Sequence, residues 1–267
     1  MATPKKTTKK TARKKTTTQK RASKKKTGLI QEGEICLPAS RLREIINNHE
    51  DNEAPWRVFR IMTEFVSGFD FLKQYEKAVT FFGSARFDEN HPDYKEAEEL
   101  ARQLCHEGFT IISGGGPGIM EASNRGASGE CQGKSVGLNI QLPKEQRVNP
   151  YVKESIAFHY FFTRKVMLSF ASQMYIFYPG GFGTLDEFFE LVTLVQTKKI
   201  QSVPIILVGN HFWEPLLKWF EESLYKKHQT IEREDMSIYY LAKDSEEAWR
   251  IIRKLIKEGK VKLGEIH

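Results

Sequence analysis

The stretch QMYIFYPGGFGTLDEFFELVTLVQTKKI (residues 173–200) contains the pattern that decides the fold. Its apolar, aromatic opening predicts a short buried β-strand, and the proline and glycines that follow predict a loop. The remaining residues place apolar side chains at helical spacing. The same succession of strand, loop and helix recurs from residue 77 onward. Strands that alternate with helices in this way indicate a parallel sheet with helices on both faces.

Three parts are predicted along the chain. Residues 1–27 form a disordered tail rich in lysine and threonine, and residues 28–76 form an N-terminal helical extension. Residues 77–267 form a Rossmann-like, doubly wound α/β domain that carries the ligand site. Within the extension, helices are predicted at 38–49 and 54–75. These helices contain no reactive motif, so we expect them to cap the domain or to form an oligomer contact.

The positive charge of the chain is concentrated in its tail. Residues 1–27 hold 12 of the 41 lysines and arginines and no acidic residue. Residues 28–267 contain the remaining 29 basic residues and all 34 acidic residues, so this part of the chain has a net charge of −5. Such a tail buries too little apolar surface to offset its ordering entropy. It either keeps the protein soluble or contacts nucleic acid non-specifically through counterion release.

Several classes of site are not expected from the composition. The cysteines Cys36, Cys105 and Cys131 are few and widely spaced, which argues for a reducing compartment and against a disulfide framework or a zinc site. No H-E-x-x-H motif occurs, and no apolar run reaches the roughly 18 residues of a membrane span. We therefore expect a soluble cytoplasmic protein that uses no metal and makes no membrane contact.

Glycine-rich loops follow three of the predicted strands. Glycine allows positive φ and a close approach of ligand to backbone, and the helix after each loop offers free N–H groups to an anion. In an open α/β sheet, ligands bind beyond the carboxyl ends of the strands. These loops therefore predict a phosphate-bearing ligand at one sheet edge. They are Gly83-Ser84-Ala85-Arg86, Gly114-Gly115-Gly116-Pro117-Gly118 and Gly180-Gly181-Phe182-Gly183-Thr184.

Two common nucleotide motifs are excluded. Residues 114–119 are not the dinucleotide fingerprint, because Ile119 stands where the third glycine belongs. Residues 128–135 (SGECQGKS) are not a triphosphate-binding loop, because Ser128 replaces the first glycine and a strand is predicted where a helix is required.

Two features near the glycine loops each allow two interpretations. Thr184 and Glu187 have the spacing of a helix capping box, but Glu187 can equally be a catalytic carboxylate. Arg164 and Lys165 lie near a predicted helix N-terminus, where cations oppose the helix dipole. Either an anionic ligand lies nearby, or both side chains point to solvent.

The segments SGGGPGIMEASNRGA (113–127), FFTRKVML (161–168) and YPGGFGTLDEFFELVTLVQ (178–196) resemble the signatures of the LOG (Lonely Guy) family. That family comprises cytokinin riboside 5′-monophosphate phosphoribohydrolases, long labelled "lysine decarboxylase", and is related to bacterial nucleotide 5′-monophosphate nucleosidases. The resemblance covers about residues 55–258, and P-G-G-x-G-T-x-x-E at 179–187 is its most specific part. The segment APWRVFRIMTEFVSGFDFL (54–72) resembles the bacterial longer-chain branch, since the plant enzymes lack this extension.

The resemblance implies hydrolysis of the N-glycosidic bond of a nucleoside 5′-monophosphate, either AMP or an N6-modified AMP such as a cytokinin nucleotide. It implies Arg164 and Glu187 as catalytic residues, no cofactor, and a homodimer with the site near the subunit interface. The substrate-binding residues that we predict on this basis are Gly83, Ser84, Gly115, Gly116, Gly118, Glu121, Lys165, Pro179, Gly180, Gly181, Gly183 and Thr184.

Three other functions are alternatives to this one. A non-catalytic carrier of the same fold would bind a nucleotide or phosphate cofactor, but it would need no carboxylate near an anionic ligand. An adaptor would bind nucleic acid through residues 1–27. A decarboxylase would need pyridoxal phosphate on a lysine, and Lys165 is the obvious candidate near the site. Nothing marks out a partner for the pyridine nitrogen.

Overall fold

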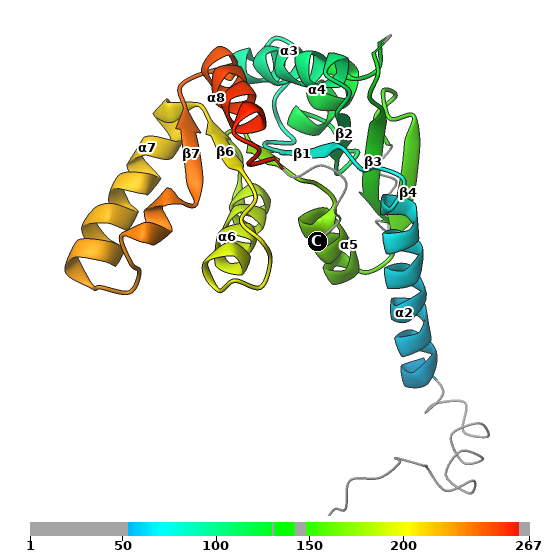
Figure 1. Cartoon of the computed structure of the whole chain (residues 1–267). Helices are drawn as coiled ribbons and strands as arrows, with labels where there is room; N and C mark the ends of the chain where they lie inside the picture. The colour runs from blue at the N-terminus through cyan, green and yellow to red at the C-terminus, as the bar shows by residue number, and fades with distance from the viewer. Residues whose placement is uncertain (1–52, 130, 142–147, 262–267) are drawn as a thin grey trace, which may run out of the picture. The chain divides into compact units, whose positions relative to one another are not determined.

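The computed structural model describes residues 53–129, 131–141 and 148–261; the predicted tail and the predicted helix at 38–49 lie outside them. The described residues form a seven-stranded parallel sheet in the order β4-β3-β2-β1-β5-β6-β7 (Figure 1). This arrangement confirms the predicted doubly wound α/β fold. The strands are β1 (Ala78–Phe82), β2 (Thr110–Ser113), β3 (Ser135–Ile140), β4 (Glu154–Phe158), β5 (Tyr175–Phe177), β6 (Ile205–Val208) and β7 (Tyr239–Ala242).

Helices cover both faces of the sheet (Figure 1). One face carries α3 (Pro92–His106), α4 (Ile119–Gly126) and α8 (Ser245–Lys257). The other carries α2 (Glu53–Leu72), α5 (Phe161–Phe170), α6 (Phe182–Gln196) and α7 (Asn210–Trp219). The chain leaves α7 as a π-helical stretch, Phe220–Lys227, and a 3₁₀ turn at Glu234–Ser237 precedes β7.

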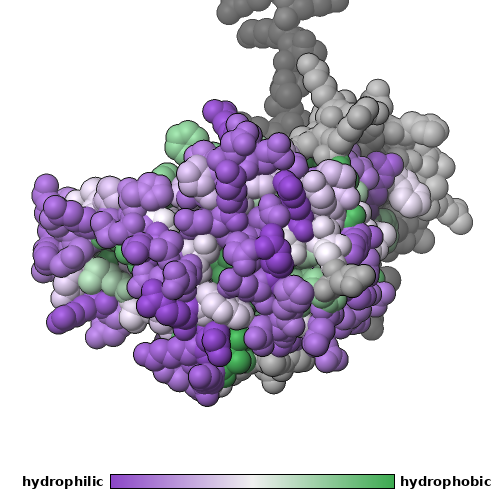
Figure 2. Space-filling view, turned by 90° about the horizontal axis from the view of Figure 1, so that it is seen from above, coloured by the Kyte–Doolittle hydropathy of each residue, from purple (hydrophilic) through white to green (hydrophobic). Residues whose placement is uncertain are grey.

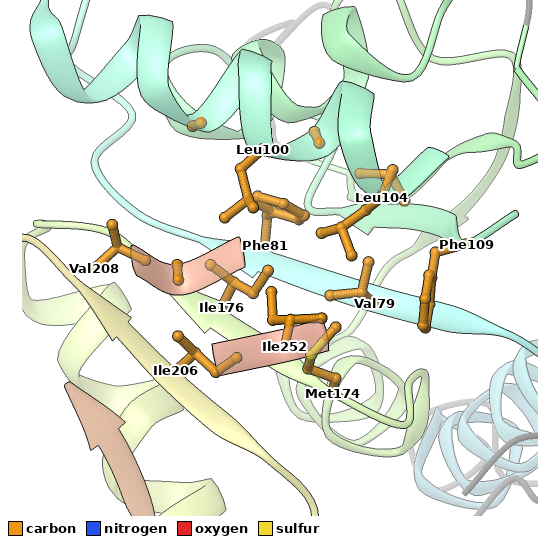
Figure 3. Packing of buried hydrophobic residues seen from close by; sticks show 14 of the residues in the cluster. Val79, Phe81, Leu100, Leu104, Phe109, Met174, Ile176, Ile206, Val208 and Ile252 are labelled. Carbon is orange, nitrogen blue, oxygen red and sulfur yellow. The ribbon is translucent and has the colours of Figure 1, made fainter. Parts of the chain in front are cut away.

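The hydrophobic core consists of two layers, one on each side of the sheet. Val79 and Phe81 of β1 point toward α3, where they pack with Leu100 (Figure 3). Ala78 and Phe82 of the same strand belong to the opposite layer. Successive side chains of a strand point to opposite faces, so a strand buried on both sides reads as a continuous apolar run. This is the reason that the sequence runs predicted a parallel sheet.

Some element boundaries differ from the predicted ones. The strand expected at 157–162 ends at Phe158, and Phe161 already opens α5. Helix α6 begins at Phe182, two residues before the expected start. Helix α7 includes Pro215, which has no N–H to donate to the carbonyl oxygen four residues earlier. Single-sequence patterns indicate the existence of elements better than their ends, because the end depends on which residue caps the helix.

The cysteine prediction was wrong. The structure pairs Cys105, in the last turn of α3, with Cys131, in the loop after α4, as a disulfide with a Cα–Cα distance of 5.6 Å. The two residues are 26 positions apart, so their spacing in the sequence gave no signal. They meet because α3 and α4 pack side by side on the same face of the sheet.

Strand β1 lies where the direction of winding reverses. Its neighbours are β2 on one side and β5 on the other, and all three strands run parallel. In doubly wound sheets, a crevice for ligands opens beyond the carboxyl ends of the strands at this switch point. The three glycine loops follow β1, β2 and β5, so the fold brings them together at one edge.

The two helical faces differ in surface character. Figure 2 looks onto the face of α3, α4 and α8, which is mainly hydrophilic. Among the described residues, the exposed large apolar side chains lie elsewhere, mostly on α2, α5 and α6. No helix in the described part of the chain combines the length and the apolarity that crossing a membrane would need.

A glycine substitution tests the close packing of α3 against α4. A Cβ at Gly126 would overlap the backbone carbonyl oxygen of Glu98, whereas a Cβ at Gly129 would meet no atom within 4 Å. We predict that Gly126→Ala lowers the free energy of unfolding by about 1–3 kcal/mol, because the two helices must separate. The matched Gly129→Ala should change it by less than about 0.5 kcal/mol. Urea unfolding measures both, and equal effects of the two variants would contradict this packing.

Candidate active site

The backbone of Ser84 joins the three glycine loops. Its N–H donates to the carbonyl oxygen of Pro179 at 3.0 Å, and its own carbonyl oxygen accepts from Ile119 N–H at 2.9 Å. The Ser84 hydroxyl accepts from Arg86 N–H within its own turn. The loops after β1, β2 and β5 are therefore connected through main-chain atoms, as the convergence of these strand ends predicted.

Glycine is required at several positions because the loops pack closely. Gly118 has a φ of +72°, and a Cβ there would overlap the carbonyl oxygen of Ser84. Gly115 has a φ of +71°, and a Cβ there would overlap the Asn139 side chain. At Gly83 a Cβ would lie 2.7 Å from the side chain of Ile119. At these three positions, contacts within the protein require glycine, without any contribution from a ligand.

The loop after β5 differs, because two of its glycines face open space. A Cβ at Gly181 or Gly183 would meet no protein atom within 4 Å. Gly180, in contrast, packs against the Thr184 side chain, which is 7% exposed. The backbone of residues 181–183 is therefore open to a ligand.

The helices α4 and α6 begin without side-chain caps. Their N-caps are Gly118 and Gly181, and no side chain accepts a hydrogen bond from their first N–H groups. On α3 and α8, by comparison, His91 and Asp244 supply such caps. Free N–H groups and the positive end of the dipole favour an anion, so the first turns of α4 and α6 suit a phosphate group.

The capping-box interpretation of Thr184 and Glu187 was wrong. The N-cap of α6 is Gly181, so Thr184 lies inside the first turn and Glu187 lies almost a full turn further along. Neither residue caps the helix. Glu187 is therefore available for another role.

A buried polar network fixes the loop after β2. Asn124 Oδ1 accepts from the Ser113 hydroxyl at 2.6 Å and from Asn149 Nδ2 at 3.0 Å, and Asn124 Nδ2 donates to Ser135 Oγ. Asn149 holds the loop at two points, because its N–H donates to Gly115 O and its Nδ2 donates to Gly116 O. Sequence reasoning missed both asparagines, since no local motif marks them.

Arg164 is directed into the site. Its Nε donates to the carbonyl oxygen of Leu138 at 2.7 Å, and its guanidinium lies against Gly114, where any Cβ would overlap it. Burial lowers the pKa of Arg164, an effect that the negative charge of Glu187 partly offsets. A guanidinium keeps its proton despite such a shift. The interpretation in which Arg164 points to solvent was wrong.

Glu187 is a buried carboxyl group without a direct partner. In the described part of the chain no group hydrogen-bonds its Oε2 atom, which is inaccessible to solvent. Burial raises the pKa of Glu187 to about 7; Lys165 and Arg164 lower it, while Glu190 and Asp186 raise it. A carboxyl group that titrates near neutral pH suits acid–base chemistry or the stabilisation of a cation.

Lys165 faces α6. Its ammonium forms ion pairs with Asp186 and with Glu190 Oε2, the latter at 2.9 Å. Burial alone would lower the pKa of Lys165, but its interactions with Asp186 and Glu190 raise it above the ordinary value. The solvent-facing interpretation was wrong for Lys165 too, because only 26% of its side chain is exposed.

The N-terminus of α5 is capped from another element. The Glu64 carboxylate of α2 accepts from His159 N–H at 2.7 Å, from Tyr160 N–H at 3.3 Å and from the Thr163 hydroxyl. The negative charge of this carboxylate interacts favourably with the dipole of α5, whereas the positive charges of Arg164 and Lys165 interact unfavourably with it. The predicted extension therefore contacts the segment that carries two predicted site residues.

Glu121 lies in the first turn of α4 and accepts a 3.3 Å hydrogen bond from the Tyr94 hydroxyl of α3. Burial raises the pKa of Tyr94 to about 12, so this hydroxyl remains a donor at neutral pH. The predicted contact of Glu121 with substrate stays a prediction.

Two cavities lie away from these residues. One of about 430 Å³ lies between the ends of α3 and α4, beside Arg102, Arg125 and Cys131. The other, of about 680 Å³, lies between α7 and β7, beside His211 and Tyr239. Neither is lined by a predicted site residue, so neither belongs to the candidate site.

The buried charge of Glu187 leads to a testable effect on stability. Because its pKa is raised to about 7 in the folded protein, the stability linked to its protonation is complete below the ordinary value and is lost as pH rises through about 7. We predict that Glu187→Gln is more stable than wild type at pH 8, by up to about 3 kcal/mol, with a smaller difference at pH 5.

Urea unfolding at the two pH values measures this difference. Glu246→Gln is the matched control, because Glu246 is an exposed residue in the first turn of α8. It should show no such gain at pH 8. A Glu187→Gln protein that is destabilised equally at both pH values would contradict the assignment of a buried, unpaired charge.

Comparison with known proteins adds independent findings. A family model described as "Possible lysine decarboxylase" matches residues 120–252. The chain is 30% identical over 134 residues to a "Probable cytokinin riboside 5′-monophosphate phosphoribohydrolase" of Oryza sativa subsp. japonica, covering 49% of this chain and 53% of that protein. It is 25% identical over 152 residues to the cytokinin riboside 5′-monophosphate phosphoribohydrolase of Rhodococcoides fascians, covering 55% and 75%.

A further relative is the pyrimidine/purine nucleotide 5′-monophosphate nucleosidase of Escherichia coli K12, 29% identical over 140 residues, covering 49% of this chain and 30% of that protein. The chain thus spans about half of the rice relative. Among solved structures, the molybdenum cofactor carrier protein of Chlamydomonas reinhardtii matches with a TM-score of 0.50 and 21% identity, covering 68% of this chain and 98% of that one. A likeness of this degree shows the fold alone.

The description of the family model names a decarboxylation, which these residues do not fit. Schiff-base chemistry with pyridoxal phosphate needs a lysine whose amine can lose its proton. Lys165 is paired with two carboxylates that raise its pKa. The relatives that the chain matches are instead named as phosphoribohydrolases and nucleosidases. Together with the match over residues 120–252, these names show that about half of the chain is similar to the LOG family.

Proposed function

We propose that this protein hydrolyses the N-glycosidic bond of a nucleoside 5′-monophosphate and releases the free base and ribose 5-phosphate. The observation that carries the proposal is the buried, unpaired carboxyl group of Glu187 beside the open glycine loop of residues 181–183. The names of the relatives from rice, Rhodococcoides fascians and Escherichia coli support the same reaction class. AMP and N6-modified AMP are the substrates that we propose first.

The phosphate group would bind at the first turns of α4 and α6. Both helices begin at a glycine and lack a side-chain cap, and the loops before them are connected through Ser84. An anion there would accept from first-turn N–H groups other than that of Ile119, which donates to Ser84 O, and it would interact favourably with both helix dipoles. Phosphate binding at this point would fix the distance between the ribose and the start of α6.

Glu187 would act on the sugar. Cleavage of the bond between C1′ and the base nitrogen builds positive charge on the ribose ring, and a nearby carboxylate stabilises that charge or activates the attacking water. Burial makes this interaction stronger than it would be in solvent. The deprotonated form performs either task, so activity should follow the titration of Glu187.

Arg164 would act beside Glu187. Its Nε is committed to Leu138 O, which leaves the remaining N–H groups of the guanidinium as donors. Those donors suit a ribose phosphate oxygen or the departing base, whose negative charge grows as the bond breaks. A cation at this place also keeps Glu187 charged during the reaction, since Arg164 lowers its pKa.

A direct assay tests the reaction and the role of Glu187. The full-length protein is incubated with AMP, other nucleoside monophosphates and N6-isopentenyl-AMP, and the released base is measured by chromatography. We expect kcat/KM to rise as pH rises through about 7, since Glu187 must lose its proton. Glu187→Gln should lower it by about 10²–10⁴-fold.

Glu246→Gln on α8 is the control and should keep wild-type activity. If wild type binds the monophosphates without releasing any base, the protein is a carrier of this fold and the proposal fails. Release that survives in a folded Glu187→Gln would keep the reaction but remove Glu187 from it.

We also propose that the protein is a homodimer that forms through the layer of α2, α5 and α6. Helix α5 contacts both of the other two, and exposed apolar side chains extend across all three helices. The face of α3, α4 and α8 is mainly hydrophilic in comparison (Figure 2). Exposed apolar side chains gathered on neighbouring helices are typical of an interaction site. The side chains are Trp56, Val58, Phe59, Met62, Val66, Phe161, Phe162, Phe182 and Phe189.

Light scattering of the eluting protein tests this assembly. We expect twice the 30.8 kDa mass of one chain for wild type, and a shift toward the monomer for Phe161→Glu, because a charge in the proposed interface must be desolvated. Phe161 is 64% exposed in one chain, so the substitution should not prevent folding. Trp219→Glu changes an exposed aromatic residue on α7 and should leave the mass unchanged. A monomeric wild type would exclude the dimer.

A further inference from the structure

Lys165 is held between two carboxylates of the neighbouring helix. Asp186 and Glu190 are one helical turn apart on α6, and both form ion pairs with its ammonium. Glu190 is 23% exposed and Asp186 66%, so Glu190 is the better shielded of the two partners. An ion pair that is partly removed from water is screened less than one at the surface.

Glu187 lies next to this pair on α6 but takes no part in it. No ion pair within the described residues joins Glu187 to a cation, and its Oε2 atom is buried without a hydrogen-bond donor. The Lys165 ammonium is near enough to lower the pKa of Glu187, yet both of its ion pairs go to other carboxylates.

The charged and titratable groups that face Glu187 come from three elements. Helix α5 contributes Arg164 and Lys165, and α6 contributes Asp186 and Glu190. Strand β5 contributes Tyr175, whose hydroxyl donates to Ser169 O and whose pKa burial raises, with Glu187 and Glu190 adding to the effect. Arg164 is fixed by Leu138 and Gly114, so Lys165 is the cation whose position depends on Glu190.

We propose that Lys165 and Glu190 are a positioning pair: Glu190 holds the Lys165 ammonium away from Glu187 and so sets the pH at which Glu187 gains its charge. In this role Lys165 does not contact the substrate, whereas the sequence analysis predicted it as a substrate-binding residue. The consequence for activity rests on the proposed function, but the titration of Glu187 does not.

Removal of Glu190 and removal of Lys165 should shift the pKa of Glu187 in opposite directions. Without Glu190, a charge that repels Glu187 is lost and Lys165 loses one of the two carboxylates that hold it, so the pKa of Glu187 should fall. Without Lys165, Glu187 keeps two neighbouring carboxylates and loses a cation, so its pKa should rise. These are the directions in which nearby charges shift a carboxyl group.

The experiment follows the titration of Glu187 directly. The full-length protein carries ¹³C at the glutamate carboxyl carbon, and the Glu187 signal is identified by its loss in Glu187→Gln. We expect its midpoint to move down by about 1 pH unit in Glu190→Gln and up by a similar amount in Lys165→Met. The acid limb of the kcat/KM profile for AMP should move in the same two directions.

Glu246→Gln is the control and should move neither the signal nor the profile. A midpoint that stays unchanged in both variants, or that moves the same way in both, overturns the proposal. If Lys165 and Glu190 had a purely structural role, their variants would lower activity at every pH without moving the midpoint of the Glu187 titration. That result would also overturn the proposal. If Glu190→Gln does not fold, the direction of the shift in Lys165→Met decides alone. If wild type cleaves no nucleotide, the proposed function fails, while the carboxyl titration still tests the pair.

Discussion

The site depends on the two main-chain hydrogen bonds of Ser84. They join the loop after the central strand β1 to the loops after β2 and β5, at distances of 3.0 and 2.9 Å. Gly83 and Gly118 allow the loops to pack together, because a Cβ at Gly83 would overlap Ile119 and a Cβ at Gly118 would overlap the carbonyl oxygen of Ser84. The helices α4 and α6 begin directly after loops that these bonds connect, and neither helix has a side-chain cap.

Sequence patterns predicted the features that are set by residues close together in the chain. Buried parallel strands are apolar runs, and glycine loops between a strand and a helix mark its carboxyl end, so the sheet and the converging loops could be read from residues 77–200. Contacts between distant residues have no such pattern. Glu64 reaches Thr163 across 99 positions, and Asn149 reaches Gly116 across 33. The capping box failed for another reason, because Thr184 and Glu187 match that motif while Gly181 is the residue that starts the helix.

The contact of Glu64 gives the N-terminal extension a physical link to the site. Arg164 and Lys165 near the start of α5 each oppose the helix dipole by some tenths of a kcal/mol. The Glu64 carboxylate lies at the same helix end and accepts from two backbone N–H groups and one hydroxyl. The cations can therefore occupy the positions from which they reach Leu138 O and α6. Helix α2, through Glu64, therefore offsets the unfavourable interaction of Arg164 and Lys165 with the dipole of α5.

The cost at Glu187, in contrast, is offset only in part, because Lys165 and Arg164 lower its pKa but no described residue pairs with it. A carboxyl group that is buried without a donor destabilises the folded state whenever it is charged, and a glutamine there would avoid the penalty. A protein that only binds a phosphate group gains nothing from this charge, because a carboxylate near an anionic ligand weakens the binding. A glycosidase gains from it at the moment when the ribose becomes cationic. A destabilising buried charge is expected where stability has been exchanged for activity. At this site the destabilising charge belongs to Glu187, the residue that the proposed reaction needs in its charged form.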